Sequence, residues 1–264
     1  VLVVFLPQEY KLAGAAVATA MSQVVGGGVP LFYFLRKNSS ILRLGKTTLD
    51  SVAIVKACIN GSSEFMSNVS MSIVGMLYNM QLLKYAGEDG VAAYGVMMYV
   101  SMIFSAVFFG YSVGIAPVIG YHDGAKNYTE LKGLLRKSLT VIGTFSVCMV
   151  VAAETSAVPL AHIFVGYDLS LVELTVSGFR IFELSFFFMG FAIFGSGFFT
   201  ALNDGLTSAL ISFLRTLVFQ VVAVLLLPLI WGINGVWISI VVAECMAVVL
   251  TVMFLFIKQK KYHY

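Results

Sequence analysis

The sequence contains 264 residues, of which 59% are hydrophobic and only 11% are charged, and its net charge is +3. A soluble globular domain carries roughly 25% charged residues. The composition therefore excludes a soluble domain and predicts an all-α integral membrane protein, a polytopic helix bundle with little mass outside the bilayer. The small net charge gives no indication of nucleic-acid binding.

A helix needs about 20 apolar residues to cross a bilayer, and the sequence holds a series of such stretches. The predicted spans cover about residues 13–35, 51–85, 91–119, 138–158, 171–202, 206–230 and 233–257. The predicted connections are a basic linker at 38–50, a turn at 84–90, an amphipathic interfacial segment at 121–137, an irregular link at 159–170 and a tight turn at 203–205. The sequence therefore predicts seven spans.

The basic residues indicate how the chain is oriented. One set of connections carries Arg36, Lys37, Arg43, Lys46, Lys126, Lys132, Arg136, Lys137, Lys258, Lys260 and Lys261. The alternate set carries only Lys11 and Lys84. Because positive residues collect on the cytoplasmic side, we expect a cytoplasmic C-terminus in a protein of the cell (plasma or inner) membrane.

An internal repeat accounts for the odd number of spans. Pro7, Leu12, Gly14, Val17 and Gln23 are matched 221 positions later by Pro228, Ile233, Gly235, Ile238 and Glu244. A repeat six spans long predicts a two-lobe transporter with six helices in each lobe. Residues 1–37 would end the first lobe, residues 38–50 would form a cytoplasmic linker, and residues 51–261 would form the second lobe. Since the chain opens within apolar sequence, we expect a longer protein whose remaining N-terminal lobe is the missing partner.

A polar stripe runs along the predicted span at 51–85. Lys56, Asn60, Glu64 and Asn68 are four residues apart, with Ser63 and Ser67 beside them. This spacing places them on one flank of a helix. Lys56 can extend to the headgroups, but Glu64 near mid-span has no interface within reach. We interpret Glu64 as part of a transport site where, with Asn60, Ser67 and Asn68, it binds Na⁺ or carries a proton.

Three stretches carry a resemblance to a known family. They are G-Y-S-V-G-I-A-P-V-I-G-Y-H-D-G-A-K-N at 110–127, F-F-T-A-L-N-D-G-L-T-S-A-L-I-S-F-L-R at 198–215 and L-L-P-L-I-W-G-I-N-G-V-W-I-S-I-V-V-A-E at 226–244. In this order and spacing they resemble the multidrug and toxic compound extrusion (MATE) family. The resemblance implies a twelve-helix antiporter, without a cofactor, that exports organic cations and other amphiphilic small molecules in exchange for Na⁺ or H⁺.

The resemblance also implies site residues. In one branch of the family, a Glu on the first helix of the second lobe and an Asp on its fourth helix bind the coupling cation. Glu64 lies on the corresponding first helix, but the fourth helix has no Asp in its inner part, and its acid Glu183 lies toward the outer end. Arg180 and Glu183 either form a structural ion pair along the helix or place Glu183 in the same cavity as Glu64. The polar groups of the last two spans, which we interpret as packing or interfacial groups, are Arg215, Gln220 and Glu244.

Two other functions remain open, a lipid-linked oligosaccharide or polysaccharide flippase and, from a different class, a seven-helix receptor. Flippase cavities are usually strongly cationic to hold phosphates, whereas only Lys56, Arg180 and Arg215 are bases within the spans. A retinal-type receptor needs a Lys in its last helix, and residues 233–257 contain none. No Ser-His-Asp arrangement or Cys/His spacing indicates an enzyme.

Overall fold

The computed structural model describes residues 11–36 and 50–264, and within these ranges the chain is helical, with no strand. The chain divides into two units, residues 1–51 and 52–264. The described part of the first unit is one helix, α2 (Lys11–Leu35), which is long and apolar enough to cross a membrane. The predicted linker at 38–50 lies almost wholly outside the described residues.

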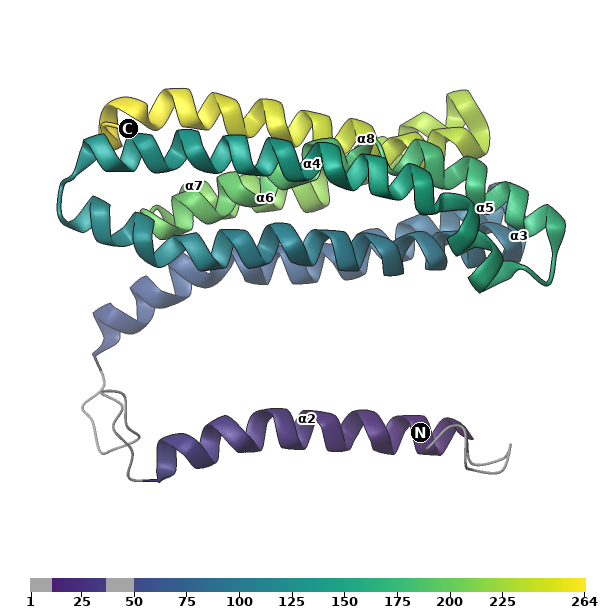
Figure 1. Cartoon of the computed structure of the whole chain (residues 1–264), viewed down its shortest axis with the longest axis horizontal. Coiled ribbons are helices and arrows are strands. Elements are labelled where there is room, and N and C mark those ends of the chain that lie inside the picture. The colour runs from purple at the N-terminus through teal and green to yellow at the C-terminus, as the bar shows by residue number, and fades with distance from the viewer. Residues whose placement is uncertain (1–10, 37–49) are drawn as a thin grey trace. The chain divides into compact units, whose positions relative to one another are not determined.

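The second unit begins with α3 (Ser51–Gly124), which is broken at Gly87 into two arms. Gly87 has φ 65° and ψ −153°, a backbone conformation that residues with a Cβ rarely adopt. Across the break, the ring of Tyr78 stacks on that of Tyr94, with centroids 5.2 Å apart. The second arm therefore runs back along the first (Figure 1), and the predicted turn at 84–90 is confirmed.

Helix α4 (Tyr128–Val165) is longer than the sequence predicted. It begins at the N-cap Asn127, whose side chain accepts a hydrogen bond from the Glu130 backbone N–H, and it continues through Pro159. The predicted irregular link at 159–170 is wrong, because neighbouring helices stabilise a proline inside a membrane helix. The predicted interfacial segment at 121–137 is largely helical, since α3 and α4 extend into it and leave only residues 125–127 as a connection. Its position at the membrane interface stays a prediction.

The next predicted span is bent. Helix α5 (Leu169–Phe182) begins at the N-cap Asp168 and meets α6 (Ser185–Ala201) at an angle of 47°. A Cβ on Gly178 of α5 would lie 2.7 Å from Met97 and 2.8 Å from Trp237. Glycine at this position thus permits α5 to pack closely against both α3 and α8.

The last two spans run from α7 (Gly205–Phe213) through the π-helical segment η2 (Leu214–Phe219) into α8 (Gln220–Tyr262). Helix α8 is broken at Gly232, where φ is 56° and ψ is −133°. The hydroxyl of Ser239 donates to the Ala223 carbonyl, 3.1 Å away across this break. The two arms of α8 therefore also lie antiparallel (Figure 1).

Helix α6 lies at the centre of the second unit and contacts α4, α7 and α8. Its side chains Phe186, Phe194, Phe198 and Phe199 are buried together with Trp237 of α8. Among the described residues the spans are α2, the two arms of α3, α4, the bent pair α5–α6 and the two passes between α7 and the end of α8. This confirms the predicted all-α membrane fold and its seven spans.

Candidate functional site

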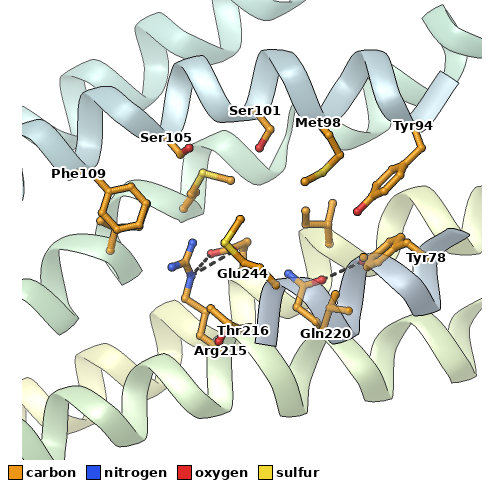
Figure 2. Close-up of a pocket in the computed structure, with 16 residues that line it drawn as sticks. Tyr78, Tyr94, Met98, Ser101, Ser105, Phe109, Arg215, Thr216, Gln220 and Glu244 are labelled. Carbon is orange, nitrogen blue, oxygen red and sulfur yellow. Dashed lines mark hydrogen bonds and ion pairs between the residues drawn. The ribbon is translucent and has the colours of Figure 1, made fainter. Parts of the chain in front are cut away.

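A cavity of about 140 Å³ lies within the second unit, between the two arms of α3 and the helices α6, η2 and α8. Figure 2 shows the second arm of α3 facing the polar groups of η2 and α8 across this cavity. Its walls are mainly apolar and sulfur-containing. The lining residues are Met71, Val74, Gly75, Tyr78, Tyr94, Met98, Ser101, Ser105, Phe109, Met189, Ile193, Arg215, Thr216, Gln220, Ile240 and Glu244.

Arg215 holds Glu244 by an ion pair in this cavity. The Nε atom of Arg215 lies 2.8 Å from Oε2 and 3.1 Å from Oε1 of Glu244. The two side chains are only 12% and 4% exposed. Because an unpaired charge within a membrane span is costly, pairing is what makes both groups tolerable there. Both bonds come from Nε, so the terminal guanidinium nitrogens make no hydrogen bond to Glu244.

The position of Arg215 on η2 gives this pair a distinct backbone setting. Leu214–Phe219 is a π-helical segment between α7 and α8. Such segments are rare and are frequently found at functional sites. The hydroxyl of Thr216, the next residue, donates to the Ser212 carbonyl 2.6 Å away. Among the described residues, the irregular helix thus carries the only arginine that lines the cavity.

A second polar contact lies in the same cavity, between Tyr78 and Gln220. The hydroxyl of Tyr78 donates to Oε1 of Gln220 at 2.9 Å, and the Tyr78 ring stacks on Tyr94 with an interplanar angle of 4° (Figure 2). All three side chains are largely buried. An apolar and aromatic cavity with few polar groups is typical of sites for small amphiphilic molecules. Its flexible methionines can adapt to ligands of different shape.

A smaller, hydroxyl-lined chamber of about 100 Å³ adjoins the cavity, and Arg215 lines both. The Ser196 hydroxyl lies 2.9 Å from that of Ser208 and 2.8 Å from that of Ser212. The buried hydroxyl of Ser112 lines this chamber and has no hydrogen-bond partner among the described residues. The chamber can hold ordered water, because a water molecule needs a roomy site with polar partners.

A charged cluster joins the α6–α7 turn to the end of α8. Asp204 accepts hydrogen bonds from Lys258 at 3.1 Å and Tyr262 at 2.9 Å, and Lys261 lies 3.6 Å from the same oxygen. Burial raises the pKa of Asp204, but hydrogen bonds from Lys258, Tyr262 and Thr207 outweigh this effect and lower the pKa to about 2. The carboxylate therefore stays charged and fastens the turn to α8.

Comparison with known proteins identifies the family of this fold. The MatE family model matches residues 65–226, a range that begins within the first arm of α3 and includes Arg215. The chain belongs to the MatE family. The three sequence stretches singled out above therefore indicated the family correctly, and members of this MATE family are transporters rather than enzymes.

The similar proteins include multidrug export proteins of staphylococci. The chain is 25% identical over 243 residues to a multidrug export protein MepA of Staphylococcus saprophyticus and 26% identical over 238 residues to one of Staphylococcus haemolyticus. These matches cover 89% and 88% of the chain, respectively, but 52% and 51% of the relatives. The chain thus spans about half the length of the curated relatives it matches.

Solved MATE structures share the fold. An outward-facing multidrug resistance MATE family transporter aligns with a TM-score of 0.85 and 22% identity, over 97% of this chain and 58% of that one. A transporter from Pyrococcus furiosus, described as having a binding pocket of reversed polarity, aligns equally well, with a TM-score of 0.85 and 22% identity over the same shares of both chains. Neither the flippase nor the receptor interpretation is supported by these matches.

The structure does not test the predicted polar stripe on α3. Asn60, Glu64 and Ser67 belong to α3, but their side chains lie outside the described residues. Asn68 is exposed on the same helix, and its backbone carbonyl accepts a hydrogen bond from Ser72. The role of Glu64 in binding Na⁺ or a proton stays a prediction.

Arg180 does not pair with Glu183 as one of our interpretations proposed. The Nε atom of Arg180 lies 3.1 Å from Oε1 of Glu154 on α4, and both side chains are about half exposed. Glu183 is buried at the bend between α5 and α6, and its Oε2 atom has no hydrogen-bond partner among the described residues. Glu154 is therefore a common neighbour, because it pairs with Arg180 and also interacts with Glu183.

Sequence analysis missed the polar groups that the structure brings together. Arg215, Gln220 and Glu244 were interpreted as packing or interfacial groups, yet all three line the buried cavity. The sequence did contain a signal for this pairing: a base, Arg215, and an acid, Glu244, lie within adjacent apolar spans. Because buried charges are usually paired, opposite charges in neighbouring spans are candidates for one buried pair.

Proposed function

We propose that this chain forms the second lobe, together with the last helix of the first lobe, of a secondary active exporter in the plasma membrane. Its substrates are cationic or amphiphilic small molecules. The proposal rests mainly on one observation, a mostly apolar cavity in which Arg215 and Glu244 form a buried ion pair. The similarity to proteins named as multidrug export proteins supports it.

The cavity offers two kinds of contact to such a substrate. The faces of Tyr78 and Tyr94 and the side chain of Met98 provide apolar and cation–π contacts. Glu244 provides the negative charge for a cationic group, provided that this group replaces Arg215 as its partner. A substrate that carries one positive charge would thus exchange for the guanidinium without leaving the carboxylate unpaired.

The export is coupled to the entry of Na⁺ or H⁺ in this proposal. Glu64 remains the proposed coupling acid, with oxygens from Asn60, Ser67 and Asn68 as the ligands that hard cations prefer. In transporters with this two-lobe plan, one repeat moves against the other around a fixed site. Binding of the cation and of the substrate at competing sites would then favour opposite conformations.

The proposal is tested in the full transporter, reconstituted in liposomes. We would measure efflux of a fluorescent organic cation driven by an imposed Na⁺ gradient and, separately, by a pH gradient. The double variant Arg215→Gln/Glu244→Gln removes both charges without leaving either one buried alone, and Glu64→Gln removes the proposed coupling charge. Glu173→Gln, an exposed acid of α5, is the matched control.

We expect Glu64→Gln to abolish ion-driven efflux and the double variant to weaken transport of the cation at least about tenfold, the value of one charged interaction. Glu173→Gln should transport normally. Undiminished efflux by Glu64→Gln under both gradients would remove Glu64 from the mechanism. Unchanged transport by the double variant would remove the Arg215–Glu244 cavity from the substrate path.

A further inference from the structure

A surface groove of about 530 Å³ runs between α4 and the last turns of α8. It is separate from the cavity that contains Arg215 and Glu244. The ring of Tyr128 at the start of α4 lies 5.0 Å from that of His263, just after α8, so both helices reach the same end of the bundle. The residues that line the groove are Lys132, Leu135, Arg136, Leu139, Thr140, Val252, Leu255, Phe256, Gln259 and Tyr264.

The groove changes from charged to apolar along its length. Its polar end carries Lys132 and Arg136 of α4, which are four residues apart and so lie on one face of the helix, and Gln259 of α8. One or two turns further into the bundle, both walls are apolar, with Leu139 on α4 and Val252 on α8. This order of charged and apolar groups matches the headgroup and the acyl chain of a phospholipid.

The two basic side chains in the groove have no acidic partner. Lys132 and Arg136 are exposed, and neither forms an ion pair with any residue in the described ranges. Lys258 and Lys261 at the same end are instead paired with Asp204. Lys132 and Arg136 therefore place unpaired positive charge at the mouth of the apolar groove.

We propose that this groove binds one anionic phospholipid. Its phosphate contacts Lys132 and Arg136, where the guanidinium donates paired hydrogen bonds and the ammonium adds a second positive charge. One acyl chain lies along Leu139, Val252 and Phe256. The hydroxyl of Tyr264 donates to the Leu255 carbonyl at 2.9 Å and so holds one edge of the groove in place. Basic pockets between membrane helices are known to select anionic lipid headgroups.

The test uses the whole chain purified in detergent and titrated with phosphatidylglycerol or phosphatidylcholine, with bound lipids counted by native mass spectrometry. The variants are Lys132→Gln, Arg136→Gln and their combination. Lys137→Gln is the matched control, because Lys137 is an exposed base on the same helix that does not line the groove. Val252→Trp fills the apolar part and leaves both charges in place. Inorganic phosphate serves as a competitor that lacks acyl chains.

We expect the unmodified chain to bind phosphatidylglycerol more tightly than phosphatidylcholine. Lys132→Gln and Arg136→Gln should each weaken the binding of phosphatidylglycerol about fivefold, the effect of one basic side chain near an anionic surface. Lys137→Gln should bind both lipids as the unmodified chain does, and Val252→Trp should weaken the binding of both lipids. Equal affinity for the two lipids, an equal loss in Lys137→Gln, unchanged binding by Val252→Trp or full displacement by phosphate would each overturn the proposal.

Discussion

Arg215 of η2 and Glu244 of α8 form a buried ion pair, with the Arg215 Nε atom 2.8 Å from Oε2 of Glu244, in a cavity with mainly apolar walls. Hydrogen bonds between charged partners are short and strong in such surroundings. The same burial makes either charge costly when its partner is removed. The pair thus holds the last two spans together and places one positive and one negative group in the cavity.

Glu244→Gln should destabilise the protein by about 3–5 kcal/mol, because it leaves the Arg215 guanidinium buried without a counter-charge. The double variant Arg215→Gln/Glu244→Gln should recover most of this loss, since neither charge remains. Thermal unfolding in detergent measures the stability of the single and of the double variant. A double variant that is as unstable as the single one would show that shape, and not charge, determines the effect.

Tyr78→Phe should cost about 1 kcal/mol, because the Gln220 carbonyl loses its hydrogen bond in a buried position. The ring remains, so its stacking on Tyr94 is preserved. The matched control is Tyr99→Phe, which alters an exposed tyrosine on the same helix. The midpoint of thermal unfolding should fall for Tyr78→Phe only, and equal shifts in both variants would contradict the role of this hydrogen bond.

Gly232→Ala should destabilise the protein by about 1–3 kcal/mol, because the backbone at φ 56° and ψ −133° is strained for a residue with a Cβ. Nothing in the surroundings would clash with the added methyl group, so the effect isolates backbone strain. Gly133→Ala places the same methyl group within α4, also in open space, and should be neutral or slightly stabilising. Unfolding in detergent distinguishes the two variants.

The Asp204 cluster predicts a dependence of stability on acid. Its pKa in the folded protein is about 2, below the ordinary value of 3.8. A lowered pKa contributes stability that is fully present above the ordinary value and is lost as the pH falls from about 4 to about 2. Asp204→Asn should flatten the stability profile in this window and lower stability at pH 7 by about 1–2 kcal/mol. An identical acid profile in the variant would contradict this assignment.

The orientation is predicted from the basic residues and can be measured by labelling. With Cys58, Cys148 and Cys245, all exposed free cysteines, replaced by alanine, the variants Ala125→Cys and Asp89→Cys report on opposite ends of the second arm of α3. A membrane-impermeant maleimide should label Asp89→Cys in intact cells and Ala125→Cys only after permeabilisation. The reverse pattern would place the C-terminus outside the cell.

Much of the fold follows from the sequence alone, because each span must be long and apolar enough for the bilayer and must satisfy its own backbone hydrogen bonds. These conditions act on one segment at a time. They identified the spans, the turn around Gly87 and the separation of the last two passes near Gly232. They misplaced the link at 159–170, because a proline such as Pro159 ends a helix in isolation but is tolerated where neighbouring helices support it.

The pairing of polar groups was decided only by the tertiary structure. Tyr78 and Gln220 are 142 positions apart, and Arg215 and Glu244 are 29 apart, so no local spacing connects them. Arg180 has an acid three residues away but pairs with Glu154 of α4, because the bend between α5 and α6 leaves Glu183 buried and Arg180 exposed. A buried charge takes the partner that packing brings within reach, and packing depends on all the helices together.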